Sequence, residues 1–391
     1  MDGMDWIKQR NRAANDAQAL SPANDGAHDT AWPAVEDLVY DHGVKARVDH
    51  LYDAVKSVVT PMEWPAHAPV IDAILQLKEE RNAVILAHNY MTPEIFNCVG
   101  DITGDSLKLA QVAAEAEADV IVQAGVHFMA ETAKILSPGK TVLIPDLRAG
   151  CSLAASITGR DVRRIREAYP HLPIVTYVNT TAEVKAECDI CCTSSNAVQV
   201  CEAIAQDWGV DTVILIPDEY LAKNVAAQTE LKILTWKGSC EVHEQFTPED
   251  IDALREAHPD AVILTHPECP PEVMNKADFA GSTGAMSSYV EKNQPAKAIL
   301  ITECSMSDNV SVANPGVQFV KPCNLCPHMK RITLAGIYEA LRDMKHQVEV
   351  DPDVAERARA SVQAMLDLPK LETPPHFDTD REAIAVPYVS V

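Results

Sequence analysis

The sequence predicts an α/β protein made of three similar three-layer αβα lobes, with parallel sheets, around a pseudo-threefold axis. The first observation is a repeat, because Cys151, Cys240 and Cys326 lie 89 and 86 residues apart. The second is the alternation of Val/Ile/Leu-rich runs with helix-like stretches, which is typical of buried parallel strands covered on both faces. A repeat of this length corresponds to a small domain rather than to a solenoid unit.

A second set of residues repeats with the same period. His88, Tyr177 and His266 each follow an apolar run, and successive members are 89 residues apart. Between each of them and its cysteine lies a hydroxyl-rich turn that opens a helix: GDSLKLA, TSSNAVQV and GSTGAMSSYV. Ligands bind beyond the carboxyl ends of parallel strands. We therefore expect all three sets to face one central cavity.

The repeat also divides the chain. The predicted segments are a poorly ordered N-terminal arm at 1–45, lobes at 46–165, 166–255 and 256–345, and a C-terminal helix and tail at 346–391. The arm is polar and turn-rich, as poorly ordered termini usually are. Apolar residues at three- and four-residue spacing between Val44 and Lys78 predict two helices before the first strand.

Composition limits the partners and the compartment. A net charge of −24 argues against nucleic-acid and anionic-membrane partners, which require clustered basic residues. Every apolar stretch is far shorter than the roughly 20 residues that span a bilayer, and the N-terminus lacks a signal pattern. We expect a cytoplasmic protein whose eleven cysteines stay reduced, which favours metal binding or catalysis over disulfides.

Three cysteines repeated in phase indicate one shared metal site, although a single buried cysteine is usually an inert packing residue. A structural zinc ion would need a fourth ligand from nitrogen or oxygen. Iron–sulfur clusters are held by cysteine thiolates, usually four. A [4Fe–4S] cluster on three cysteines would leave one iron without a protein ligand, and that iron could act as a Lewis acid.

The other cysteines leave alternatives open. The C-x-x-C-C of Cys188, Cys191 and Cys192 and the C-x-x-C of Cys323 and Cys326 could each supply two ligands to a four-cysteine zinc site. These ligand pairs would be more than a hundred residues apart, unlike those of a zinc ribbon. The C-x-x-C pair of Cys323 and Cys326 also fits a redox disulfide, which would remove a cluster ligand. The remaining cysteines are expected only to pack: Cys98, Cys201, Cys269 and Cys304.

Polar residues at the strand ends suit proton transfer and anion binding. Glu268 follows His266 by two residues and is a candidate general base, and we expect burial to raise its pKa. Tyr90 and Asn179 occupy the equivalent position in the first two lobes. Helix starts with free N–H groups attract anions, which favours a ligand with several carboxylates or a phosphate. Each hydroxyl could equally be an ordinary N-cap.

Ordered motifs across all three lobes make residues 82–341 resemble the quinolinate synthase family. The matching stretches are AHNY (87–90), GDSL (104–107), FMAETAKIL (128–136), DLRAGCSLA (146–154), TYVNT (176–180), CTSSNA (192–197), GSCEVHE (238–244), THPEC (265–269), GSTGAM (281–286) and CPHMK (326–330). Each is short, but together they are specific because they occur in order.

The resemblance implies a fold, a cofactor and a reaction. It implies three lobes around a pseudo-threefold axis and a [4Fe–4S] cluster held by Cys151, Cys240 and Cys326. It implies a transferase that condenses iminoaspartate with dihydroxyacetone phosphate, losing phosphate and water, to form quinolinate for NAD biosynthesis. It further implies functional coupling to an L-aspartate oxidase that supplies iminoaspartate.

The resemblance also implies roles for the residues of the cavity. Those implied to be catalytic are Glu268, Tyr90, His88 and His266. Those implied to bind substrate are His88, Ser106, Tyr177, Asn179, Ser194, Asn196, His243, His266, Glu268, Ser282 and Thr283. Glu268 would shuttle protons, while the open iron would hold an oxygen or nitrogen of an intermediate.

Two other classes of function remain. An iron–sulfur hydro-lyase could dehydrate a hydroxy acid at an open iron, but it would not explain matching motifs in all three lobes. A non-catalytic iron–sulfur sensor or cluster carrier would not need His, Tyr, Asn and Glu side chains at the strand ends. An anaerobic assay for quinolinate distinguishes these classes.

Overall fold

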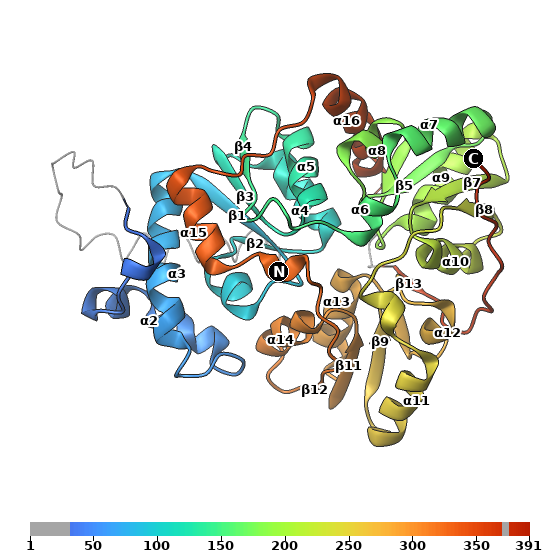
Figure 1. Cartoon of the computed structure of the whole chain (residues 1–391). Helices are drawn as coiled ribbons and strands as arrows, with labels where there is room; N and C mark the ends of the chain where they lie inside the picture. The colour runs from blue at the N-terminus through green and yellow to red at the C-terminus, as the bar shows by residue number, and fades with distance from the viewer. Residues whose placement is uncertain (1–31, 370–374) are drawn as a thin grey trace. The chain divides into compact units, whose positions relative to one another are not determined.

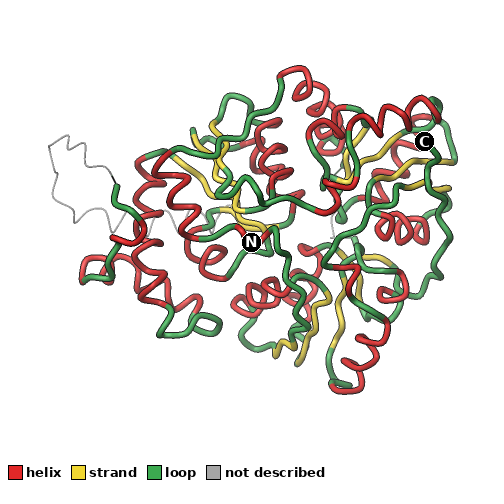
Figure 2. The backbone as a smooth tube through the Cα atoms, in the orientation of Figure 1, coloured by secondary structure: helices red, strands yellow, loops and turns green. Residues whose placement is uncertain are grey.

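The computed structural model describes residues 32–369 and 375–391, and the strands of these residues form three separate sheets (Figures 1 and 2). Most of the predicted N-terminal arm, residues 1–31, lies outside the described residues. The rest of that arm contains the 3-10 helix η1 (Val35–Asp37) and the start of α2 (His42–Val55). The predicted segment boundaries remain predictions.

The first sheet has four parallel strands in the order β2-β1-β3-β4. Its strands are β1 (Ala83–His88), β2 (Ile102–Gly104), β3 (Val120–Ala124) and β4 (Thr141–Leu143). The helices of this part are α2, α3 (Trp64–Glu80), the π-helix η2 (Ile95–Val99), α4 (Ser106–Glu115), α5 (His127–Leu136) and α6 (Ser152–Ser156). The two helices predicted between Val44 and Lys78 are confirmed as α2 and α3.

The second sheet has four parallel strands in the order β6-β5-β7-β8. Its strands are β5 (Ile174–Tyr177), β6 (Ile190–Cys192), β7 (Thr212–Ile216) and β8 (Lys232–Thr235). The helices of this part are α7 (Gly159–Ala168), α8 (Ala182–Ala186), α9 (Ala197–Trp208), α10 (Glu219–Gln228) and the 3-10 helix η3 (His243–Gln245).

The third sheet has five strands in the order β12-β11-β9-β10-β13. Its strands are β9 (Val262–Thr265), β10 (Phe279–Gly281), β11 (Lys297–Ile301), β12 (Gln318–Val320) and β13 (His376–Phe377). The remaining helices are α11 (Pro248–Ala257), α12 (Pro271–Met274), α13 (Thr283–Asn293), α14 (Cys304–Ala313), the 3-10 helix η4 (Met329–Arg331), α15 (Leu334–Asp343) and α16 (Pro352–Leu366).

The three sheets share one strand order. In each, the second strand along the chain is next to the first, and the third and fourth strands follow on the other side. The third strands, β3, β7 and β11, are largely buried apolar runs with helices packed against them, as in parallel sheets of α/β proteins. His88 and Tyr177 end the first strands of their sheets, and His266 directly follows β9. The sequence repeat therefore corresponds to a structural repeat.

Several local features differ from the sequence predictions. The short strands β2, β6 and β10 were not predicted, because three-residue strands carry little periodicity. Strand β13, in the expected tail, pairs antiparallel with β10, so the third sheet is not entirely parallel. After Cys326 the chain forms the 3-10 helix η4, and α15 begins only at Leu334.

Helix α16 packs against elements of both the first and the second part of the chain. Ala358 on α16, Ile135 on α5 and Ala182 on α8 form one buried cluster. Arg359 donates a hydrogen bond to the carbonyl of Ile135, and Ser361 donates one to the carbonyl of Lys185. The C-terminal helix thus connects the first two sheets. No helix within residues 32–369 and 375–391 is long and apolar enough to cross a membrane.

Replacing Ile135 by Ala should lower the free energy of unfolding by about 2–5 kcal/mol, because the fully buried side chain would leave a cavity where α5, α8 and α16 meet. Ile135→Val should cost only about 0.5–1.5 kcal/mol. Thermal and urea unfolding of the two variants measure the difference. Equal losses would show that this cluster does not hold the helices together.

Candidate active site

One cavity collects most of the residues predicted to form the site. Its lining includes the three repeated cysteines and strand-end or helix-start residues from all three parts of the chain. The predicted residues that line it are His88, Tyr90, Ser106, Cys151, Tyr177, Asn179, Ser194, Cys240, His243, His266, Glu268, Thr283 and Cys326. The convergence predicted from the repeat is therefore present in the structure.

Asn196 and Ser282 do not line this cavity. Asn196 accepts a hydrogen bond from the backbone N–H of Thr193, and Ser282 caps α13 by accepting one from Ala285. Both line a neighbouring pocket that shares Asp105 and Ser195 with the first cavity. The ordinary capping interpretation fits Ser282, whereas the side chain of Asn196 makes no capping hydrogen bond to α9.

The three cysteines occupy the same kind of backbone turn. The carbonyl of each accepts a hydrogen bond from the residue four positions later, which is Ala155, Glu244 or Lys330. The thiol of each also interacts with the backbone N–H groups two and three positions later. The N–H groups of a first helical turn lack intrahelical partners. Each turn therefore directs two donors at one sulfur.

Burial opposes ionisation of these thiols. It raises the pKa of Cys151 to about 12, against the lowering effect of the N–H groups of Ala154 and Leu153. Burial likewise raises the pKa of Cys240 and of Cys326, again against two N–H groups each. A bound cation deprotonates a coordinating thiol outright. The turns are thus suited to thiolates that are stabilised by a metal.

The donor set next to Cys240 supports a metal site. The Cys240 sulfur, a ring nitrogen of His243 and a carboxylate oxygen of Glu268 lie within 4.8 Å of one another, which makes them a group of three among the described residues that could hold an ion. The three cysteine turns line the same cavity. Sulfur ligands favour zinc, copper(I) or iron–sulfur clusters over magnesium or calcium.

Gly238 allows the Cys240 loop to pack closely. A Cβ atom on this residue would lie 2.5 Å from Ser156 Oγ and 2.7 Å from the carbonyl oxygen of Pro217. Real Cβ contacts are never this short, so only glycine fits without movement of the backbone.

The expectations for the cysteines are wrong in three respects, the first of which is that all eleven stay reduced. Cys323 is disulfide-bonded to Cys304, so it does not pair with Cys326, and Cys304 is more than a packing residue. Cys326 is free, as are Cys188, Cys191 and Cys192. The disulfide also removes Cys323 from the alternative four-cysteine zinc site. The partner of Cys323 was missed because residues 304 and 323 show no characteristic spacing.

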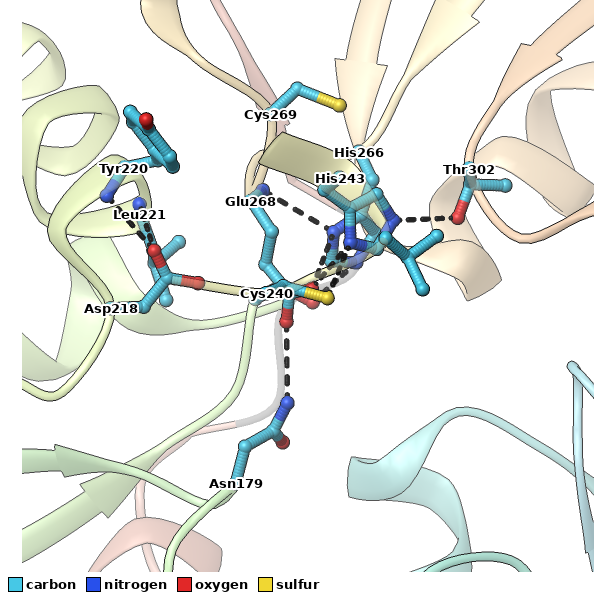
Figure 3. A network of polar contacts seen from close by, with 12 residues as sticks. Asn179, Asp218, Tyr220, Leu221, Cys240, His243, His266, Glu268, Cys269 and Thr302 are labelled. Carbon is cyan, nitrogen blue, oxygen red and sulfur yellow. Dashed lines mark hydrogen bonds and ion pairs between the residues drawn. The ribbon is translucent and has the colours of Figure 1, made fainter. Parts of the chain in front are cut away.

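Glu268 is the centre of the polar network in Figure 3. Its Oε1 accepts a hydrogen bond from Asn179 Nδ2 at 3.2 Å, which Figure 3 shows. The same oxygen accepts one from Tyr177 Oη at 2.6 Å. Its Oε2 lies 2.7 Å from Nδ1 of His243. The carboxyl group is buried, yet both of its oxygens have partners. Each partner stabilises the ionised form.

We expected burial to raise the pKa of Glu268, but the pKa is lowered. Burial does act to raise it, but His266 and His243 and the hydrogen bonds from His243 and Tyr177 outweigh this effect. They hold the pKa of Glu268 below its ordinary value. The side chain is therefore an ionised carboxylate at neutral pH, able to accept a proton.

His88 and His266 have the same local geometry. The backbone N–H of the residue two positions later, Tyr90 or Glu268, donates a hydrogen bond to Nδ1 at 3.2 Å or 3.3 Å. Nδ1 is therefore the unprotonated nitrogen of the neutral ring, so Nε2 carries the hydrogen. In His266 this Nε2 lies 3.3 Å from Ser194 Oγ. Both rings present a donor rather than an acceptor at Nε2.

These imidazoles are neutral because of burial. Burial lowers the pKa of His88 to about 4 and that of His266 to about 3, although Glu268 acts in the opposite direction on both. Burial, followed by Glu268, also raises the pKa of Tyr90 and of Tyr177 well above the ordinary value. Apart from Glu268, these groups are uncharged hydrogen-bond donors.

Thr302 and Asp218 belong to the network but were not predicted. Thr302 Oγ1 lies 2.6 Å from Tyr90 Oη and 2.9 Å from His243 Nε2. Asp218 caps α10 with Oδ1, while its buried Oδ2 has no hydrogen-bond partner among the described residues. Burial and Glu268 raise the pKa of Asp218 well above the ordinary value. Thr302 follows β11 and Asp218 follows β7, and each of these is the third strand of its sheet along the chain. The repeat could therefore have indicated both positions.

Comparison with known proteins gives a consistent family. Residues 72–367 match the family model described as Quinolinate synthetase A protein (NadA). The chain is 64% identical over 316 residues to Quinolinate synthase 2 of Mesorhizobium japonicum, which covers 81% of this chain and 96% of the relative. It is 59% identical over 340 residues to Quinolinate synthase of Caulobacter vibrioides, which covers 87% and 93%.

The chain belongs to the quinolinate synthase family. Quinolinate synthase of Agrobacterium fabrum gives a similar result, with 60% identity over 318 residues and coverage of 81% of this chain and 91% of the relative. The family resemblance inferred from the ordered motifs is thereby confirmed. The relatives are named as synthases, so the family is one of enzymes.

Lys330, in the CPHMK motif, compensates a fully buried carboxylate. Its Nζ lies 2.9 Å from Oε1 of Glu303 and donates hydrogen bonds to the Tyr90 carbonyl and to Ser305. Lys330→Met would leave Glu303 charged and without its cation, which should cost about 3–5 kcal/mol of stability. In the control Lys321→Met, which removes an exposed ion pair with Asp308, about 1 kcal/mol or less should be lost. Equal melting temperatures for the two variants would contradict this assignment.

The buried histidines should make stability depend on pH. An unfolded His88 binds a proton as the pH falls through about 6.5, whereas the folded residue remains neutral until about pH 4. Stability should therefore decrease as the pH falls through this window, by about 3 kcal/mol for His88. His88→Gln should flatten this part of the stability curve. In urea titrations from pH 7.5 to 4.5, the exposed-site variant His171→Gln should follow the parent, and an unchanged slope in His88→Gln would contradict the assignment.

Proposed function

We propose that this chain is a quinolinate synthase that condenses iminoaspartate with dihydroxyacetone phosphate, releasing phosphate and water, in the synthesis of NAD. The observation that carries the proposal is one cavity lined by three equivalent cysteine turns together with Glu268 and its donors. The names of the relatives support the same activity.

The cofactor in this proposal is a [4Fe–4S] cluster held by Cys151, Cys240 and Cys326. The donor set fits such a cluster, because three sulfurs line one cavity and each is approached by two backbone N–H groups. When bound, a cluster with three protein ligands supplies a Lewis-acidic iron. His243 contacts the Cys240 sulfur with Nδ1 at 3.1 Å, so it connects the sulfur ligands to the Glu268 network.

The substrates are anions, and the cavity offers neutral donors. Iminoaspartate carries two carboxylates and the triose carries a phosphate. The Nε2–H groups of His88 and His266 can donate to these oxygens, as can the hydroxyls of Ser106, Ser194 and Thr283. Helices α4 and α13 also begin beside the cavity at Ser106 and Thr283, and helix N-termini attract anions. An acidic protein can therefore bind acidic substrates without a cluster of basic side chains.

Glu268 is the proposed proton carrier. Its carboxylate is ionised and faces the cavity, so it can remove a proton from carbon or nitrogen during enolisation and tautomerisation. Tyr177 and Asn179 hold one oxygen, and His243 holds the other. Tyr90 lies close to His243 and Thr302, where its hydroxyl can return a proton to a leaving hydroxide.

Three further predictions depend on the assignment of this chain as a quinolinate synthase. The pseudo-threefold arrangement of the lobes, the cytoplasmic location and the coupling to an L-aspartate oxidase remain predictions. A hydro-lyase or an iron–sulfur sensor would use the same cysteines. The lining of neutral anion donors around Glu268 favours a synthase acting on several anionic groups.

The deciding experiment is an anaerobic assay for quinolinate with iminoaspartate and dihydroxyacetone phosphate. The parent protein should form quinolinate, and Glu268→Gln should lower kcat by about 10²–10⁴-fold, as expected for loss of a general base. Glu256→Gln, at an exposed site on α11, is the matched control. A parent protein that carries an intact cluster but forms no quinolinate would exclude the synthase and favour the alternatives.

The cofactor assignment is tested separately by iron analysis and visible absorption. The anaerobic parent should be brown and contain about four irons per chain. Cys151→Ala, Cys240→Ala and Cys326→Ala should each lose most of the chromophore, whereas Cys201→Ala, at a buried position outside the cavity, should retain it. Colourless parent protein containing only zinc would contradict the cluster.

A further inference from the structure

The loops that carry the three cysteines also contact one another. Ser152, next to Cys151, donates a hydrogen bond from Oγ to the carbonyl of Ser239 at 2.9 Å. The same Oγ accepts one from the backbone N–H of Glu241 at 3.1 Å. Ser239 and Glu241 flank Cys240. One hydroxyl therefore fixes the distance between the first and second cysteine loops.

His328 joins the third loop to the other two. This residue follows Cys326 by two positions, and its Nε2 lies 2.9 Å from Oε1 of Glu241, at ion-pair distance but without hydrogen-bond geometry. Its ring also lies against Gly150, where a Cβ atom would be 3.5 Å from Cε1 and Nδ1. The contacts of Ser152, Glu241 and His328, with Gly150, thus form a closed circuit through all three loops. We name these four residues the cysteine-loop belt.

The belt lies between the cavity and solvent. All four of its residues line the cavity that contains the cysteines. The side chains of His328 and Glu241 are 29% and 37% exposed, while Cys151 and Cys240 are only partly accessible to solvent. His328 Nδ1 is itself buried, without a hydrogen-bond partner among the described residues. A polar ring atom with no partner points to a group that the cavity holds when it is occupied.

We propose that the His328–Glu241 pair of the cysteine-loop belt positions the three cysteine turns and shields the centre that they hold from oxidants and chelators. The proposal rests on the proposed function, because it assumes a centre bound by Cys151, Cys240 and Cys326. Groups around a metal site control solvent access and ligand orientation. An ordinary surface ion pair would contribute little, about 0–1 kcal/mol, and would leave the centre unaffected.

The first test measures how fast the centre is lost. The parent, His328→Ala and Glu241→Ala are purified anaerobically, exposed to air or to a chelator, and followed by visible absorption and iron release. Loss should be about tenfold faster in both variants, as is usual when groups supporting metal ligands are removed. Glu241→Gln, which keeps the size of the side chain, should fall between them and the parent. His171→Ala, at an exposed site remote from the cavity, should match the parent.

The second test does not require the centre. Metal-free protein is treated with N-ethylmaleimide, and the modification of each cysteine is followed by peptide mass spectrometry. Cys151, Cys240 and Cys326 should react faster in His328→Ala and Glu241→Ala than in the parent, while buried Cys201 should be unchanged as an internal reference. Unchanged reactivity of Cys201 also shows that the variants remain folded.

The outcomes distinguish a failure of the proposed function from a failure of the role proposed for the cysteine-loop belt. A parent without a cluster would contradict the proposed function, and the labelling experiment would still test the shielding by the belt. A parent with a cluster, together with equal loss rates and equal labelling in the parent and both alanine variants, would overturn the role of the belt and leave the proposed function standing.

Discussion

The buried charge of Glu268 is the constraint on which the site depends. An ionised carboxylate without partners would cost several kcal/mol in the interior, so each oxygen must be hydrogen-bonded or paired. Tyr177 and Asn179 reach it from the end of β5, and His243 reaches it from the turn that begins at Cys240. The second sheet, the third sheet and one cysteine turn must therefore meet at this point, and a candidate metal site lies where they meet.

A comparison of Asp218 with Glu268 shows how strongly the partners of a buried carboxyl group affect its pKa. It is as buried as Glu268, but only one of its oxygens accepts hydrogen bonds, and the other has no partner among the described residues. Its pKa is raised, whereas that of Glu268 is lowered. Two carboxyl groups with opposite shifts are typical of sites that separate the roles of proton donor and acceptor. Here the neighbouring histidines and the hydrogen-bond donors lower the pKa of Glu268, whereas burial is the main cause of the raised pKa of Asp218.

The repeat in the sequence was sufficient to predict the cavity. The spacing of Cys151, Cys240 and Cys326, and of His88, Tyr177 and His266, identified residues that the three sheets do bring together. It was sufficient because the three sheets have the same strand order, so that equivalent strands end at equivalent positions. Contacts that do not follow the repeat could not be predicted from it. The Cys304–Cys323 disulfide and the antiparallel strand β13 depend on tertiary positions that no period encodes, and the effect of burial on Glu268 was misjudged because its donors come from other loops.

The proposed cluster, held by three protein sulfurs beside Glu268, would leave one iron open to substrate. Mössbauer spectra of protein reconstituted with ⁵⁷Fe, recorded with and without a bound dicarboxylate product such as quinolinate, test this claim most directly. We expect a [4Fe–4S] spectrum in which the signal of a single iron changes on binding, while the other irons keep their parameters. A spectrum in which no iron responds, or one without a four-iron cluster, would contradict it.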